Sequence, residues 1–155
     1  MAQRFPGFGI LELPPTAGRR SWVYATCGMS SFQRTGDIEL HLHAPGQLSD
    51  HVETLTAIAH FHLTSAVLGL GHTVRLGRPW IPQSSCDHGL ISLPYLDGPA
   101  LENCTLDGWS LRCLWLVPIT AAEVAFKQSR GLEALEALFE SKGLDYANPG
   151  RRSVI

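Results

Sequence analysis

Seven histidines in 155 residues make a metal site the first chemistry to consider. Glu39, His41 and His43 are spaced two apart, so on a β-strand they would share one face and could supply a two-histidine, one-carboxylate ligand set. The same spacing is typical of a polar strand face that meets solvent or a helix, and short metal motifs often match by chance. His60 and His62 would point about 200° apart on a helix and could not chelate one ion. The sequence therefore predicts no metal and no other cofactor.

Nucleophilic catalysis would need a thiol or hydroxyl beside a base, and the sequence offers one short candidate. In an extended Cys86-Asp87-His88 segment, the thiol and the imidazole would face the same side. A Cys-His dyad usually draws its members from distant parts of a chain and needs a third orienting group. The sequence also lacks Gly-x-Ser-x-Gly, a glycine-rich phosphate loop and a zincin histidine pair. We predict that the protein is not an enzyme, with a metal- or thiol-dependent hydrolase as the alternative.

Charge and hydropathy limit the environments and partners of this chain. Its 12 Lys and Arg residues and 14 Asp and Glu residues are interspersed and give a formal net charge of -2, which leaves no basic stripe for phosphates or anionic lipids. The start lacks the apolar core of a secretion signal, and no apolar run approaches the roughly 20 residues that span a bilayer. The four cysteines form no Cys-x-x-Cys pair, which favours reduced thiols. A cytoplasmic protein that binds neither nucleic acid nor membrane is predicted.

The strands that must position these side chains follow from the hydrophobic periodicity. Alternating or β-rich runs predict strands over residues 9–13, 21–27, 37–43 and 110–117, with short strands within 72–99. Asp107-Gly108 is a two-residue hairpin signal, and Pro118 is expected to end the strand that follows it.

Three helices are predicted. An apolar period of three to four residues follows Asp50-x-x-Glu53, which resembles a capping box, and predicts a long helix that ends at Gly69. Thr120-x-x-Glu123 opens a second helix, and a third follows it closely. This order predicts one α+β domain over residues 1–155, in which a mixed β-sheet packs with one long helix and two C-terminal helices.

Six blocks of the sequence resemble the suppressor-of-fused-like domain. They occur in the same order and extend over nearly the whole chain. The blocks are TCGMS (26–30), ELHLHAP (39–45), the run over 71–102, LVPITAAEVAF (116–126), GLEALEALFE (131–140) and YANPGRRSVI (146–155). Six ordered blocks are more specific than any single motif, so the chain is identified as a member of this family.

The resemblance implies a protein that works by binding another protein. Eukaryotic members restrain a transcription factor of the Hedgehog pathway by closing two lobes on an extended segment of it. Bacterial members with a domain of this size look like immunity proteins that neutralise toxins delivered between competing cells. A second lobe is not expected in this chain, so two-lobed clamping is not carried over. The predicted function is a bacterial immunity or antitoxin-type protein that binds a toxin, with a regulatory partner-binding module or an assembly subunit as further alternatives.

The run from Gly71 to Glu102 is the predicted partner-binding surface. It has no regular periodicity, yet it is rich in aromatic and apolar residues held by Pro and Gly, and a long irregular stretch inside a compact domain is more often functional than idle. The candidate residues are Trp80, Asp87, His88, Tyr95 and Asp97.

Alternatives remain open for several of these residues. Trp80 could pack in the core beneath a proline turn, and Asp97-Gly98-Pro99 is typical of a turn. Pairing of a partner strand with an exposed sheet edge is a second binding mode. The oligomeric state is left open.

Overall fold

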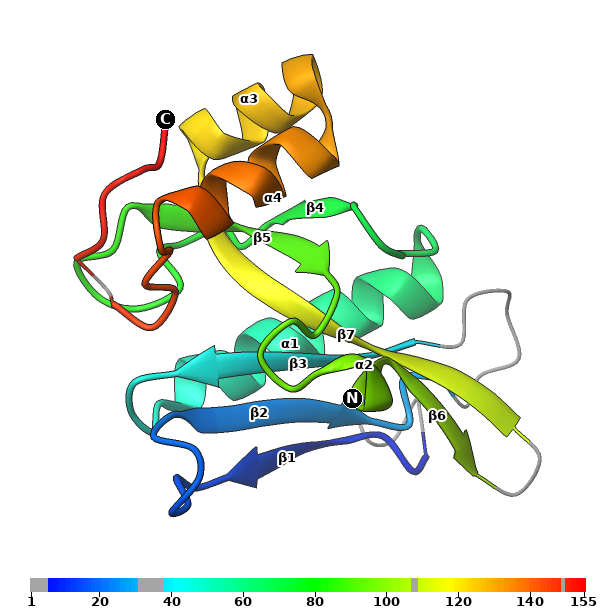
Figure 1. The fold of residues 1–155 in the computed structure, drawn as a ribbon. Coiled ribbons are helices and arrows are strands. Elements are labelled where there is room, and N and C mark those ends of the chain that lie inside the picture. The colour runs from blue at the N-terminus through cyan, green and yellow to red at the C-terminus, as the bar shows by residue number, and fades with distance from the viewer. Residues whose placement is uncertain (1–5, 31–37, 107–108, 149) are drawn as a thin grey trace.

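The structure, a computed structural model, describes residues 6–30, 38–106, 109–148 and 150–155, which form one mixed β-sheet with helices on both faces (Figure 1). The strands are β1 (Gly9–Leu13), β2 (Trp22–Cys27), β3 (Ile38–Ala44), β4 (Thr73–Arg75), β5 (Cys86–Ser92), β6 (Asn103–Leu106) and β7 (Trp109–Thr120). The helices are α1 (Ser49–Thr64), α2 (Pro99–Glu102), α3 (Ala121–Arg130) and α4 (Leu132–Ser141). The α+β class with two C-terminal helices is confirmed. Within the described ranges, no helix is long and apolar enough to cross a membrane.

The strand order is β1-β2-β3-β7-β5-β4, and β6 also pairs with β7. Only the β3–β7 pair is parallel among the described strands, and it aligns His41 with Trp115. The first part of β7 lies between β3 and β6, and its second part pairs with β5 from Trp115 to Thr120. A central strand covered on both faces needs a nearly continuous apolar run, which Leu114 to Val117 supplies.

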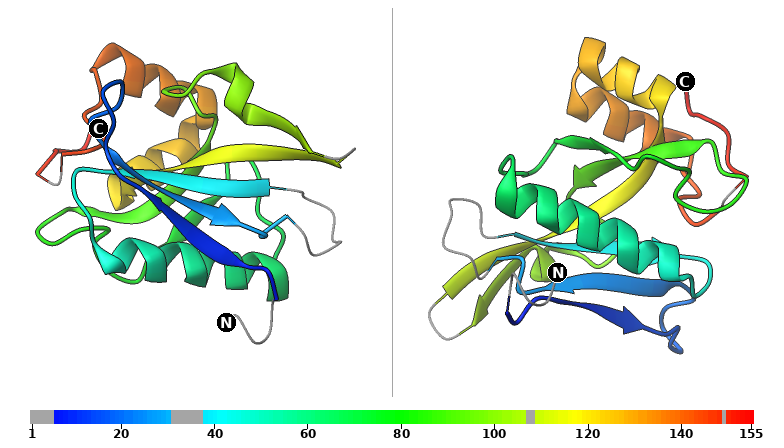
Figure 2. Two further views of the ribbon diagram at one scale, coloured as in Figure 1. Left: turned by 90° about the horizontal axis from the view of Figure 1, so that it is seen from below. Right: turned by 180° about the vertical axis from the view of Figure 1, so that it is seen from behind.

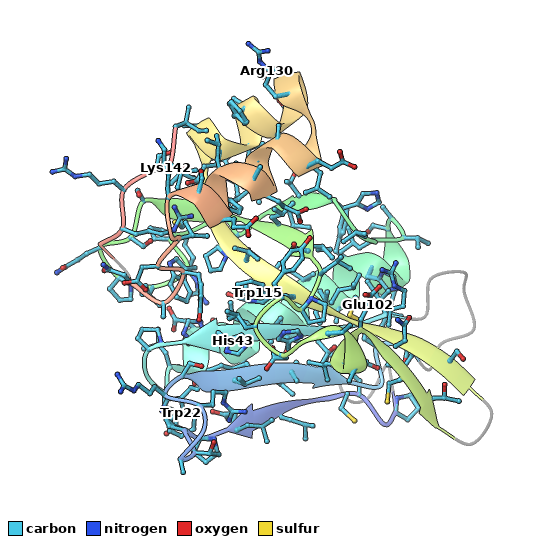
Figure 3. All side chains as sticks on the ribbon, in the orientation of Figure 1. Trp22, His43, Glu102, Trp115, Arg130 and Lys142 are labelled. Carbon is cyan, nitrogen blue, oxygen red and sulfur yellow. The ribbon has the colours of Figure 1, made fainter. Side chains whose placement is uncertain are left out.

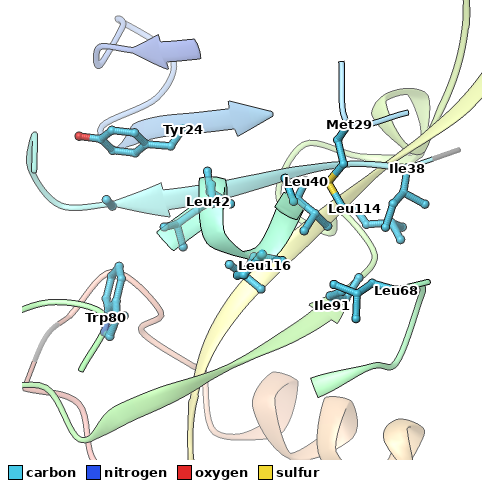
Figure 4. Close-up of a cluster of buried hydrophobic side chains, with 14 of the residues drawn as sticks. Tyr24, Met29, Ile38, Leu40, Leu42, Leu68, Trp80, Ile91, Leu114 and Leu116 are labelled. Atoms are coloured by element: carbon cyan, nitrogen blue, oxygen red, sulfur yellow. The ribbon is translucent and has the colours of Figure 1, made fainter. Parts of the chain in front are cut away.

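Alternate residues of β7 belong to two hydrophobic clusters on opposite faces of the sheet. Leu114 and Leu116 lie in the first cluster, which includes α1 residues and is shown in Figure 4. Trp115, Val117 and Ile119 lie in the second cluster, against α3 and α4. The right view of Figure 2 shows α1 across one face of the sheet, and α3 and α4 on the side of β4 and β5, away from β1.

The prediction for α1 is corrected at both ends of the helix. The N-cap is Leu48 without a side-chain cap, and Asp50 and Glu53 instead face Arg78, with N–O distances of 3.6 and 2.8 Å. The helix ends at Thr64, five residues before Gly69, where the chain turns away and the Leu68 N–H donates to Nδ1 of His62 at 2.9 Å. The apolar spacing that continues in the sequence through Ala66 and Leu70 does not belong to the helix, because both residues are exposed and Leu68 returns to the core instead.

The prediction that Pro118 ends its strand is wrong. Pro118 lies opposite Gly89 within β7, where β5 is the neighbouring strand on one side and the pairing with β3 has already ended at Trp115. The missing N–H of proline therefore breaks no ladder, and the Pro118 carbonyl accepts a hydrogen bond of 2.7 Å from Arg151. The capping box of Thr120 and Glu123 at the start of α3 is confirmed. Asp107 and Gly108 lie outside the described residues, although Leu106 pairs with Trp109 in the antiparallel β6–β7 ladder around them.

His51 on α1 is a fully buried histidine with an aromatic residue on each side. Its ring centroid is 4.9 Å from that of Tyr24 and 5.7 Å from that of Trp80, and the side chain is 1% exposed. Neither ring nitrogen makes a hydrogen bond with the described residues. Burial lowers the pKa of His51 to about 4, with smaller opposed effects of Asp50 and Arg78. The folded protein therefore holds His51 neutral.

This burial predicts acid sensitivity. The unfolded chain takes up a proton at His51 near pH 6.5 and the folded chain only near pH 4, so stability is lost as the pH falls between these values. Between pH 7 and pH 5 we expect His51 to contribute a loss of about 2 kcal/mol to the free energy of unfolding, measured by urea titration. His51→Leu should flatten this dependence, whereas His72→Gln, at an exposed site, should not. An unchanged pH slope in His51→Leu would contradict the assignment.

Candidate partner-binding groove

A groove lies between α4 and the face of the sheet formed by β5 and β7. It has a volume of about 620 Å³ and is called the α4 groove below. It is lined by Ser92, Tyr95, Leu96, Trp115, Val117, Glu133, Glu136, Ala137, Phe139, Glu140, Gly143, Leu144 and Tyr146. A pocket of this size with an apolar floor and a few polar groups is the usual form of a binding site.

The regular spacing of three elements builds the α4 groove. Strand alternation places Ser92 of β5 with Trp115 and Val117 of β7 toward α4. On α4, Leu135 is fully buried and anchors the helix against the sheet. The neighbouring positions 133, 136, 137 and 140 then form one helical face along the groove.

Glu136 links the two sides of the α4 groove. It accepts hydrogen bonds from the Ser92 hydroxyl at 2.6 Å and from the Tyr95 hydroxyl at 3.1 Å. Glu133 and Glu140 lie on the same helical face and are exposed. The α4 side of the groove is therefore acidic, whereas its floor is apolar and aromatic.

The loop after β5 leaves large apolar side chains uncovered at the mouth of the groove. Tyr95 is 59% exposed and Leu96 is 46% exposed. Both belong to the predicted surface over residues 71–102, but Leu96 was not among its candidates. Amphipathic Tyr and apolar Leu beside a groove are suited to contact with another protein.

Trp80 does not belong to the surface. It is 3% exposed in the first hydrophobic cluster, and its indole Nε1 donates to Ser84 Oγ at 3.0 Å. The turn after Trp80 returns the chain to Cys86, whose carbonyl accepts a hydrogen bond from the Trp80 N–H at 2.9 Å. Trp80 is therefore a core residue, which was the alternative left open from the sequence.

Asp87 and His88 contact each other and do not line the α4 groove. Nδ1 of His88 is 2.7 Å from the Asp87 carboxylate. A bulge between Cys86 and His88 breaks the strand alternation that would have put the thiol and imidazole on one side. Cys86 is fully buried, and this burial raises the pKa of its thiol. The geometry therefore gives no support to a thiol nucleophile at this position.

Asp97 has the turn backbone that its sequence predicts, but its side chain makes a long-range contact. Its N–H donates to the Pro94 carbonyl at 3.0 Å. Its Oδ2 atom lies 3.2 Å from Nε2 of His41 and 3.0 Å from Nε2 of His43. These imidazoles, His41 first, lower the pKa of Asp97 to about 2 against the opposing effect of burial. The three residues are called the histidine cluster below.

Glu39 is not the carboxylate partner of these histidines. Its side chain accepts hydrogen bonds of 3.0 Å from the N–H groups of Gly28 and Ser30, and one of 2.5 Å from the Thr26 hydroxyl. It thus holds the turn after β2. The group of Glu39, His41 and His43 considered from sequence is therefore not formed, and the carboxylate beside the two histidines is that of Asp97.

The missed groove residues lie mainly on α4. Helical spacing of Glu133, Glu136 and Glu140 was visible in the sequence, but an acidic stripe is usually a solvated face. Only the position of α4 above β5 and β7 shows that this stripe borders a hollow.

Comparisons with known proteins agree with this fold. The family model described as suppressor of fused protein (SUFU) matches residues 6–152. A crystal structure from Neisseria gonorrhoeae FA 1090, of a protein described as a suppressor of fused homologue, has a TM-score of 0.87 and 35% sequence identity, covering 99% of this chain and 81% of that chain. No curated protein matches the sequence.

Two further structures share the fold at low sequence identity. A chain in the crystal structure of the Sufu-Fu complex has a TM-score of 0.70 at 13% identity, over 97% of this chain and 79% of that chain. Drosophila suppressor of fused has a TM-score of 0.67 at 14% identity, over 95% of this chain and 42% of that chain.

Proposed function

This chain belongs to the suppressor of fused protein (SUFU) family, and we propose that it is a non-catalytic domain that binds a protein partner in the α4 groove. The main support for this proposal is the groove itself, which has an apolar floor, an acidic helix face, and the exposed side chains of Tyr95 and Leu96 at its mouth. A structure with this fold was solved as the Sufu-Fu complex, which supports protein binding as the mode of action.

The chemistry of the groove suggests which partner segment would fit. Trp115, Val117 and Phe139 offer apolar contact, and the carboxylates of Glu133 and Glu140 favour a positively charged neighbour. The bound segment should therefore carry apolar anchors flanked by Lys or Arg. It would cover Tyr95 and Leu96 at the mouth of the groove.

The finer proposal is that the partner is a toxin delivered by a competing bacterium. This chain would then be a cytoplasmic immunity protein that blocks the toxin by direct binding. The bacterial relative, 35% identical over 99% of this chain, supports a bacterial setting. Products of genes adjacent to the gene for this chain are the partners to test first.

Groove variants should weaken binding without unfolding the protein. Tyr95→Ala and Leu96→Ala remove exposed anchors, and each should weaken affinity roughly thirtyfold, or about 2 kcal/mol, measured by calorimetry with the candidate toxin. Glu133→Lys should also weaken the affinity for the partner, because the new positive charge repels a basic segment. Growth of cells that produce the toxin together with each variant provides a second measurement.

Glu12→Lys is the matched control for charge reversal, because Glu12 is exposed on the edge strand β1 and lies outside the groove. It should bind normally. Loss of binding in Glu12→Lys with normal binding in the groove variants would move the site to the β1 edge. If the groove captures a protein that is not a toxin, the immunity role fails and the binding site stands.

A further inference from the structure

We propose that His41, His43 and Asp97 form a binding site for a divalent transition metal ion, with Zn²⁺ as the first candidate. The site does not depend on the proposed function of the α4 groove. β3 supplies His41 and His43, and the loop after β5 supplies Asp97. The contact between His43 and Asp97 joins residues 54 positions apart in the sequence.

The fold places the two imidazoles on the same face of the sheet. Leu40 and Leu42 of β3 point into the first hydrophobic cluster, so His41 and His43 point to the opposite face. There the ring of His43 lies 5.8 Å from that of Trp115 (Figure 3). It lies 6.1 Å from the ring of Tyr146. Both histidines are buried, at 5% and 3% exposure.

The donor atoms have nearly the spacing that a metal ion needs. Oδ2 of Asp97 is 3.2 Å from Nε2 of His41 and 3.0 Å from Nε2 of His43, and the ligand atoms of the three residues lie within 4.8 Å of one another. Tetrahedral zinc holds its nitrogen and oxygen ligands at about 2.0–2.1 Å, which separates them by about 3.3 Å. Small side-chain movements would therefore admit the ion.

Both ring nitrogens of His41 are buried without a hydrogen bond to the described residues. Nε2 of His41 nevertheless lies 3.2 Å from Oδ2 of Asp97, which is close enough for an ion to bind both atoms after a small movement. An unpaired polar atom in the interior is costly, and an ion is one of the groups that can satisfy it. A metal between Asp97 and the two rings would give Nε2 of His41 a bond.

His43 already has the outer contact that is typical of a metal ligand. Its Nδ1 lies 2.9 Å from Ser21 Oγ, which can accept the Nδ1 proton and leave the Nε2 lone pair free for a metal.

Three protein ligands leave a fourth position for water or for a ligand from another molecule. His43 and Asp97 border a second hollow of about 610 Å³, which is lined also by Arg19, Arg20 and Tyr146. Two arginines at this opening favour an anionic fourth ligand, such as a carboxylate. Two nitrogens and one oxygen suit Zn²⁺ better than Mg²⁺ or Ca²⁺, which prefer oxygen ligands.

The test is metal binding by chelator-treated full-length protein, measured by calorimetry with Zn²⁺ and by the visible absorption of Co²⁺. We expect one ion per chain, a tetrahedral Co²⁺ spectrum, and a higher melting temperature with Zn²⁺ but not with Mg²⁺. Asp97→Asn preserves the shape of a partly exposed side chain and should reduce Zn²⁺ affinity at least tenfold. His43→Gln should do the same.

His88→Gln is the matched control, because His88 also faces an aspartate but lies outside the histidine cluster. It should retain full affinity. The proposal is overturned if the folded wild-type protein binds no Zn²⁺ at 100-fold molar excess. It is also overturned if the bound ion is unaffected by both Asp97→Asn and His43→Gln.

Discussion

Glu123→Ala is expected to lower the free energy of unfolding by about 3–5 kcal/mol, because it removes the partner of a buried arginine. Glu123 is fully buried, and its carboxylate accepts from the Arg151 guanidinium at 2.7 and 2.9 Å. It also accepts from the N–H groups of Thr120 and Val154. The loss is a large part of the total for a domain of this size, which is about 5–15 kcal/mol. Urea unfolding followed by circular dichroism measures it.

Glu133→Ala is the matched control, since Glu133 is an exposed acidic residue in the first turn of α4. It should cost less than about 1 kcal/mol, the usual contribution of an acidic residue to the helix dipole. Arg151→Met should also destabilise the protein, because it leaves Glu123 buried without its counterion. A change below 1 kcal/mol in Glu123→Ala would show that the C-terminal segment does not depend on this pair.

Trp80→Ala should lower the free energy of unfolding by about 3–5 kcal/mol and leave partner affinity unchanged in the fraction that stays folded. The indole is 3% exposed and fills the first hydrophobic cluster beside His51. Tyr95→Ala should show the opposite pattern, with little loss of stability and weaker binding, because Tyr95 is 59% exposed. Melting temperature and affinity are measured side by side for both variants.

Trp80→Phe keeps an aromatic ring in the core and is the variant to use if Trp80→Ala does not fold. It loses the indole hydrogen bond to Ser84 and should melt earlier, with normal affinity. Normal melting together with weaker binding in Trp80→Phe would place Trp80 at the interface and contradict its assignment to the core.

Local patterns were sufficient to predict most elements. Strand alternation located β1 at its observed bounds and β2 and β3 within one residue, and the capping box located the start of α3. The end of α1 could not be predicted, because Ala66 and Leu70 continue the apolar spacing in the sequence after the helix has stopped at Thr64. Pro118 was misread because proline usually ends a strand, whereas here it lies past the end of the β3–β7 pairing, where no ladder needs its N–H.

The candidate sites depend on contacts that no short pattern contains. His41 and His43 were recognised as sharing a face, but the carboxylate facing them comes from Asp97, and only the sheet topology brings that loop across β3. The predicted surface over residues 71–102 contributes Tyr95, Leu96 and Ser92 to the α4 groove. Its other wall belongs to α4, which sequence periodicity could predict as a helix but could not place over β7.

β7 links the hydrophobic clusters on the two faces of the sheet, and this link affects how the protein unfolds. Leu114 and Leu116 belong to one cluster while Trp115 and Val117 belong to the other, so neither cluster can separate without disturbing the same backbone. Amide protons along this strand should exchange with solvent only when the whole molecule opens, whereas those of β1, where Leu11 is 50% exposed, can exchange through local fraying. A proteolytic cut or a packing defect beside α1 would then release the groove on the far face in the same cooperative step.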